Sequence, residues 1–265
     1  MTKNSFAKKI ISGSMILLLL LSGCRSKTPP AKRPVGSPVT LTNESLQVMK
    51  NVNSYRFTGS GAIHYIGVNH RGTFRLAGEY LSPQRSHLKM EMKLGNANYY
   101  SEVLYRAPNF YQFVHESWKM VTYSPDTLMQ PGYQPVNTII DQIAQVSTNP
   151  VFGEEVVLGG SKVTVVKLSS NPTKLKSYLQ KQFNKAAAIE PERRQGLTTF
   201  LRTCNVSQGY TLYIDPATKR IVKLLFLQTV KINLSNKTME NQMSIEYSLS
   251  DFGTGVKLPT ITGKH

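Results

Sequence analysis

The residue types that most often carry catalysis are present in this sequence but scattered. Five histidines stand singly along 265 residues, and none lies at metal-ligand spacing from a second histidine, a cysteine or a carboxylate: His64, His70, His87, His115 and His265. No phosphate-binding glycine loop or dinucleotide fingerprint occurs, and Gly59-Ser60-Gly61 is interpreted as a kink in a strand. Asp215 precedes a proline and fits a turn. The sequence therefore predicts a non-enzyme without metal or cofactor, with each histidine on the surface or on a strand.

Cys24 is the residue whose surroundings do point to chemistry. Lys3, Lys8 and Lys9 precede an apolar stretch over residues 10–21, and Leu21-Ser22-Gly23-Cys24 follows at once. Because a spanning helix needs about 20 apolar residues, this shorter stretch predicts a signal peptide over residues 1–23. Apolar, small, small, Cys resembles a bacterial lipobox, which implies cleavage before Cys24 and a diacylglycerol on its thiol.

A lipid on Cys24 would place the protein on a membrane without spanning it, because two acyl chains hold a protein stably. We therefore expect an extracytoplasmic protein anchored to the cell membrane, or to the outer membrane in an organism that has two. Cys204 is the only other cysteine, so no disulfide framework is possible. It is expected to be a buried helix residue rather than a reactive thiol.

Composition separates a tether from a globular part. Residues 24–40 are rich in proline and basic residues, which predicts a semi-rigid, solvated tether, and residues 41–265 form the predicted domain. The formal charge is +17, with 12 basic and three acidic residues between Lys162 and Lys223. Either these are solvated helix faces or they form a patch that faces anionic lipid or polymer. Nucleic acid is disfavoured as a partner because the compartment lies outside the cytoplasm.

Apolar periodicity divides the globular part into strands and helices. Apolar residues alternate with charged or small ones in several segments, most clearly 87–94 and 243–249, which predicts antiparallel strands. Helical spacing predicts a short helix that Thr42 or Asn43 caps, and further helices near 137–146, 175–185 and 197–204. Our count is about ten to eleven strands with three or four helices, an α+β fold.

Four short segments then carry a resemblance to a known family. They are Asn53-Ser54-Tyr55-Arg56-Phe57, Trp118-Lys119-Met120-Val121, Tyr213-Ile214-Asp215-Pro216-Ala217-Thr218-Lys219 and Leu249-Ser250-Asp251-Phe252-Gly253. In this order they resemble the LolA/LolB-like superfamily, including anchored lipoproteins of the LppX/LprG type. The resemblance implies a strongly curved antiparallel sheet, a half-barrel, whose concave face is covered by amphipathic helices. It also implies an apolar cavity for acyl chains between sheet and helices.

Inward-facing apolar side chains are the candidates to line such a cavity. On strands they are Leu88, Met90, Met92, Leu94, Met243, Ile245, Tyr247 and Leu249, and on a helix they are Leu175, Leu179 and Phe183. Flexible methionines suit a variable acyl ligand. The same residues would equally pack a filled core. The first case predicts a protein that binds or transfers a lipid or other amphiphile. The second predicts a non-catalytic scaffold that supports a partner protein of the cell envelope or of spore germination.

Replacement of the lipobox cysteine tests the anchor. We expect the Cys24→Ser chain to leave the membrane fraction and to lose labelling by radioactive palmitate, because no thiol remains to receive a diacylglycerol. Membrane fractionation and metabolic labelling measure both effects, and Cys204→Ser serves as the matched control that keeps the anchor. Membrane attachment that survives Cys24→Ser would contradict the lipobox interpretation.

Overall fold

A computed structural model describes residues 36–66, 70–83, 85–106, 109–121, 136–189, 194–234 and 237–261. Cys24, the predicted signal peptide and the tether up to residue 35 lie outside these residues. Within them, none of the helices combines the length and the apolar character that crossing a membrane requires.

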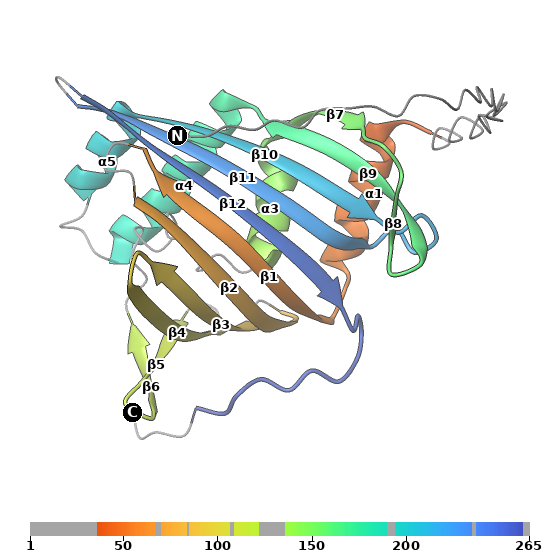
Figure 1. The fold of residues 1–265 in the computed structure, drawn as a ribbon, viewed down its shortest axis with the longest axis horizontal. Helices are drawn as coiled ribbons and strands as arrows, with labels where there is room; N and C mark the ends of the chain where they lie inside the picture. Colours follow the sequence, from red (N-terminus) through yellow and green to blue (C-terminus); the bar gives the residue numbers. More distant parts are fainter. Residues whose placement is uncertain are drawn as a thin grey trace, which may run out of the picture. The chain divides into compact units, whose positions relative to one another are not determined.

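The main element is an antiparallel sheet of 12 strands (Figure 1). The order across the sheet is β6-β5-β4-β3-β2-β1-β12-β11-β10-β9-β7, and β8 pairs with β9 off this path. The strands are β1 (Ser54–Tyr65), β2 (His70–Leu81), β3 (Arg85–Leu94), β4 (Ala97–Arg106), β5 (Asn109–Val114), β6 (Ser117–Val121), β7 (Ser147–Phe152), β8 (Val156–Leu158), β9 (Ser161–Ser170), β10 (Cys204–Ile214), β11 (Ile221–Leu234) and β12 (Lys237–Ser250).

In the part of the chain that the structure describes, four helices lie on one side of this sheet (Figure 1): α1 (Pro38–Lys50), α3 (Val136–Val146), α4 (Pro172–Ile189) and α5 (Arg194–Thr203). Helix α1 begins earlier than the sequence analysis expected, and so takes residues 38–40 from the predicted tether. Ser37 caps it by accepting a hydrogen bond from the Val39 backbone N–H at 3.2 Å, and Pro38 occupies the first turn. A serine followed by proline is a favourable helix start, because proline gives up an N–H that has no helical partner there.

Period-two alternation assigns each strand residue to one of two faces. In β3, Leu88 and Met90 are buried whereas Lys89 and Glu91 are exposed. The buried face meets the helices in one hydrophobic core. In this core the α3 side chains at helical spacing, Ile139, Ile143 and Val146, are almost inaccessible to solvent. We call the face toward the helices the inner face and the opposite one the outer face. The predicted α+β class with an antiparallel sheet is confirmed.

Two expectations were wrong, and one strand was not foreseen. A strongly curved half-barrel was expected, but the sheet is open and not strongly curled. Strand β7 is absent from the segments that the sequence analysis assigned to strands, and it contains Pro150 and a residue with positive φ, Asn149. Both are tolerated because β7 is an edge strand with an irregular register. Cys204 was expected on a helix, but α5 ends at Thr203 and Cys204 opens β10.

A turn and a hairpin match their sequence signals. The Asp215 carboxylate accepts hydrogen bonds from the Ala217 backbone N–H at 3.0 Å and from the Thr218 hydroxyl at 2.6 Å, which closes the turn before β11. Strands β5 and β6 form a hairpin in which Phe113 lies opposite Trp118. Asp215 is therefore the turn former that the sequence indicated.

Substitution of Gly78 tests how closely the inner face is packed. A Cβ at this position of β2 would meet the backbone carbonyl oxygen of His87 and the ring of Phe57. We expect Gly78→Ala to lower the free energy of unfolding by roughly 1–3 kcal/mol, because a packed core resists added volume. Denaturant titration measures the change, and Gly255→Ala is the control, since no atom lies within 4 Å of the Cβ it would add. Equal stability of the two variants would contradict the packing described.

Candidate functional site

An apolar pocket lies where α4, α5 and β10 meet, on the inner side of the sheet. Its volume is about 290 Å³, at the lower end of the range for ligand sites. Its lining residues are Pro172, Thr173, Leu175, Lys176, Ser177, Leu179, Leu201, Cys204, Asn205 and Val206. Lys176 alone among these described residues carries a charge, so the pocket combines an apolar wall with one cation.

Local sequence signals position the α4 side of this pocket. The Asn171 side chain accepts a hydrogen bond from the Lys174 backbone N–H at 3.0 Å, and Pro172 occupies the first turn. Leu175 and Leu179 are one helical turn apart and buried, whereas Lys176 is exposed. The helix therefore turns its apolar stripe to the sheet and leaves an ammonium group at the rim.

The opposite wall is the junction between α5 and β10. Because β10 begins directly after α5, Leu201 and Cys204 lie close together in the chain at the change from helix to strand. Burial raises the pKa of the Cys204 thiol, while a backbone hydrogen bond and the Lys176 ammonium act against this shift. Cys204 is half-buried and lines the pocket, so a ligand in the pocket would change the access of reagents to its thiol.

The eleven cavity candidates from the sequence lie on the inner side of the sheet, but only Leu175 and Leu179 line this pocket. Most of the others are buried in the hydrophobic core: Leu88, Met90, Met243, Ile245, Tyr247, Leu249 and Phe183. Met92 packs against that core and also lines a second hollow, of about 980 Å³, and Leu94 is half-buried. Leu201, Cys204 and Val206 were not among the candidates. The helical stripe that contains Leu201 and Cys204 was the signal that could have included them.

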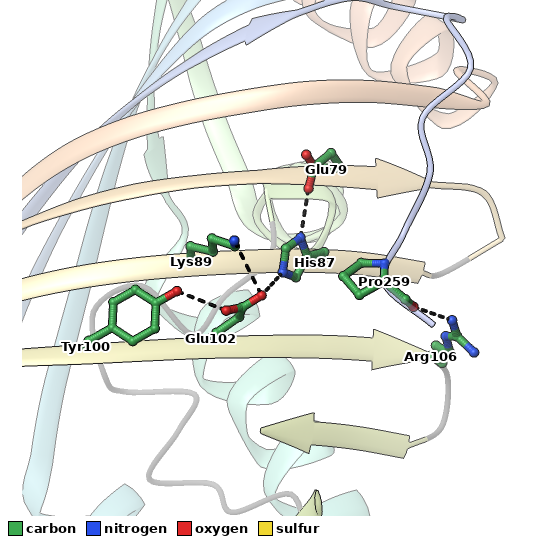
Figure 2. A network of polar contacts seen from close by, with 7 residues as sticks. All are labelled: Glu79, His87, Lys89, Tyr100, Glu102, Arg106 and Pro259. Atoms are coloured by element: carbon green, nitrogen blue, oxygen red, sulfur yellow. Dashed lines mark hydrogen bonds and ion pairs between the residues drawn. The ribbon is translucent and has the colours of Figure 1, made fainter. Parts of the chain in front are cut away.

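A second cluster is a polar network on the outer face (Figure 2). The His87 Nδ1 atom lies 2.9 Å from Glu79 Oε2, and its Nε2 atom lies 2.8 Å from Glu102 Oε1. Both contacts are hydrogen bonds when the ring carries a proton on each nitrogen. The Tyr100 hydroxyl donates to Glu102 at 2.9 Å, and Lys89 Nζ lies 3.6 Å from the same carboxylate. The network ties β2, β3 and β4 together.

His87 lies on strand β3, one of the two positions that the sequence analysis allowed for the histidines, and it is buried there. The Trp118 ring packs edge-on against the His87 ring, with centroids 6.1 Å apart. Figure 2 also shows Arg106, which donates a hydrogen bond to the Pro259 carbonyl at 2.7 Å. Burial acts to raise the pKa of Glu102, but hydrogen bonds from His87 and Tyr100 together with the Lys89 charge outweigh it and lower that pKa. Within the described residues, no three His, Cys, Asp or Glu side chains are placed to hold a metal ion.

Comparison with solved structures finds similarity over most of the chain. LprF from Mycobacterium bovis is 11% identical with a TM-score of 0.48, and the match covers 85% of this chain and 97% of that one. LppX from Mycobacterium tuberculosis is 11% identical with a TM-score of 0.43, covering 84% and 98%. A LolA superfamily protein from Nitrosomonas europaea is 8% identical with a TM-score of 0.35, covering 84% and 96%. No protein-family model and no curated protein matches the sequence. The similarity concerns the fold alone.

Glu102→Gln tests the polar network. Because the pKa of Glu102 is lowered in the folded state, its stabilising effect is present above the unfolded value of about 4.3 and is lost as the pH falls through the folded value. We expect the variant to be less stable by about 1–3 kcal/mol near neutral pH and to approach the wild type in acid. Urea denaturation across pH measures this. The exposed Glu91→Gln is the control, and a pH-independent difference would refute the assignment.

Proposed function

We propose that the protein is a lipid-anchored, extracytoplasmic protein that binds an anionic amphiphile in the pocket between α4, α5 and β10. The observation that carries the proposal is the pocket itself, whose apolar wall ends at the Lys176 ammonium. An acyl chain would lie against Leu175, Leu179 and Leu201, and an anionic headgroup would meet Lys176. The binding that we propose is non-covalent and reversible, because it consists of apolar contact and one ion pair.

The expected affinity follows from the size of the pocket. A chain segment of about six methylenes, buried at about 0.8 kcal/mol each, contributes about 5 kcal/mol. Because ordering the ligand opposes binding, the acyl segment alone gives a dissociation constant no lower than a few tenths of a millimolar. Binding of this strength is readily reversible. A protein held on the membrane by a lipid on Cys24 would then exchange amphiphiles with the bilayer, which supplies them at high local concentration.

A scaffold that supports an envelope or germination partner is the alternative function. The close packing of Leu88, Met90 and Ile245 in the core favours it, because these inner-face residues contact protein rather than open space. The two proposals differ in whether the α4–α5–β10 pocket takes up a ligand, and occupancy of this pocket is measurable.

Protection of the Cys204 thiol tests amphiphile binding. In a full chain with Cys24→Ser, Cys204 is the sole thiol. We expect laurate, kept below its critical micelle concentration, to slow alkylation of Cys204 by a maleimide several-fold, because the thiol lines the pocket. Alkylation should be measured at alkaline pH by mass spectrometry, since burial raises the pKa of this thiol.

Two lysine variants on α4 distinguish a direct contact between Lys176 and the headgroup from a general effect of positive charge on the helix. Lys176→Ala should remove the preference for laurate over lauryl alcohol, whereas Lys181→Ala, exposed on the same helix and outside the pocket lining, should keep it. Absence of protection by either compound would overturn the proposal and favour the scaffold function.

A further inference from the structure

The outer face of the sheet carries a large hollow that the apolar pocket does not involve. Its volume is about 980 Å³, and it extends over β4, β3, β2, β1, β12 and β11. A smaller hollow of about 300 Å³ adjoins it along β1, and Ser60, Arg75 and Glu246 line both. Together the two hollows form a groove that we call the outer groove.

Strand register explains why this groove exists. Residues directly opposite one another on paired strands share a face, and one such row runs Leu225, Glu246, Ser60, Arg75, Glu91 and Tyr100. The next row contributes small side chains in its middle, namely Ser244, Ala62 and Thr73. Small residues on β1 and its neighbours form the floor, and long side chains on both sides form the walls.

The electrostatics of the outer groove differ from those of the whole chain. The chain has a formal charge of +17, but the described residues that line the large hollow include two basic ones, Arg75 and Lys93, and two acidic ones, Glu91 and Glu246. Glu246 also pairs with Lys223, with Nζ and Oε1 2.8 Å apart. A surface with this near balance of charge offers no general attraction for a polyanion or an anionic membrane.

Tyr100 adds a fixed aromatic surface at one end of the groove. Its side chain is 59% exposed, yet its hydroxyl donates a hydrogen bond to Glu102. The same carboxylate is in hydrogen-bond contact with the buried His87 (Figure 2). The ring therefore presents an apolar surface to solvent at little further cost in side-chain entropy. Around it stand groups that donate and accept hydrogen bonds, among them Asn98, Glu91 and Arg75.

We propose that the outer groove binds a neutral, polyhydroxylated chain, that is, an oligosaccharide. An aromatic ring beside amide, carboxylate and guanidinium groups matches a sugar, which has one apolar ring face and a rim of hydroxyls. The joined hollows suit a linear ligand, and the balanced charge suits an uncharged one. This site lies on the other face of the sheet from the proposed amphiphile pocket and does not depend on it.

Titration with neutral tetrasaccharides tests the proposal. The full chain is purified in a detergent without a sugar headgroup, so that no detergent competes, and is titrated with chitotetraose, cellotetraose and maltotetraose by calorimetry. We expect at least one of them to bind. Tyr100→Ala and Arg75→Ala should each weaken that binding by about fivefold or more, and Tyr100→Phe, which keeps the ring, should weaken it less.

Arg71→Ala is the matched control, because Arg71 is exposed on the same face of β2 but does not line the hollow. Ala62→Leu fills the floor at an exposed position and should also reduce binding, which guards against variants that fail to fold. The proposal is overturned if no tetrasaccharide binds at about 10 mM, or if Tyr100→Ala, Arg75→Ala and Ala62→Leu bind as the wild type does. Anionic vesicles that bind in an Arg75-dependent way where tetrasaccharides do not would also overturn it.

Discussion

The pairing of β1 with β12 is the contact on which the geometry of both faces depends. Ten residue pairs, from Arg56 opposite Ser250 to Tyr65 opposite Asn241, fix the register in the middle of the sheet. Because side chains alternate with a period of two, a slip by one residue would carry Ile245 and Tyr247 to the outer face and Glu246 into the core. The hydrophobic core therefore enforces the register, and the register then decides which residues line the apolar pocket and which line the outer groove.

The two faces of the sheet meet different physical demands. On the inner face, apolar side chains require a cover, and α1, α3, α4 and α5 supply it. The cover is incomplete where α5 passes into β10, and this is where the pocket lies. Much of the outer face is exposed to water, so charged and small residues are tolerated there. Around the buried His87, polar contacts link neighbouring strands on this face. One sheet thus has an apolar pocket on one face and a polar groove on the other.

Local periodicity was sufficient to predict the parts of the fold that are governed by burial. The alternation in β3 and β12 and the stripes of α3 and α4 were visible in the sequence because each buries one face. Strand β7 was missed because Pro150 argues against a strand unless its edge position is known. The network of Glu79, His87 and Glu102 has no spacing signal, since strand pairing brings together residues that are 8 and 15 positions apart. The limited curvature depends on the packing of the whole sheet, which no single segment encodes.

The position of β12 has a consequence for the order in which the molecule is completed. Strand β12 (Lys237–Ser250) is synthesised after every other strand that the structure describes, yet it fills the place between β1 and β11 near the centre of the sheet. Until it arrives, β1 has an open hydrogen-bonding edge and the two halves of the sheet are unconnected. A nascent chain in this state is a substrate for chaperones and is prone to pair with a second copy of itself.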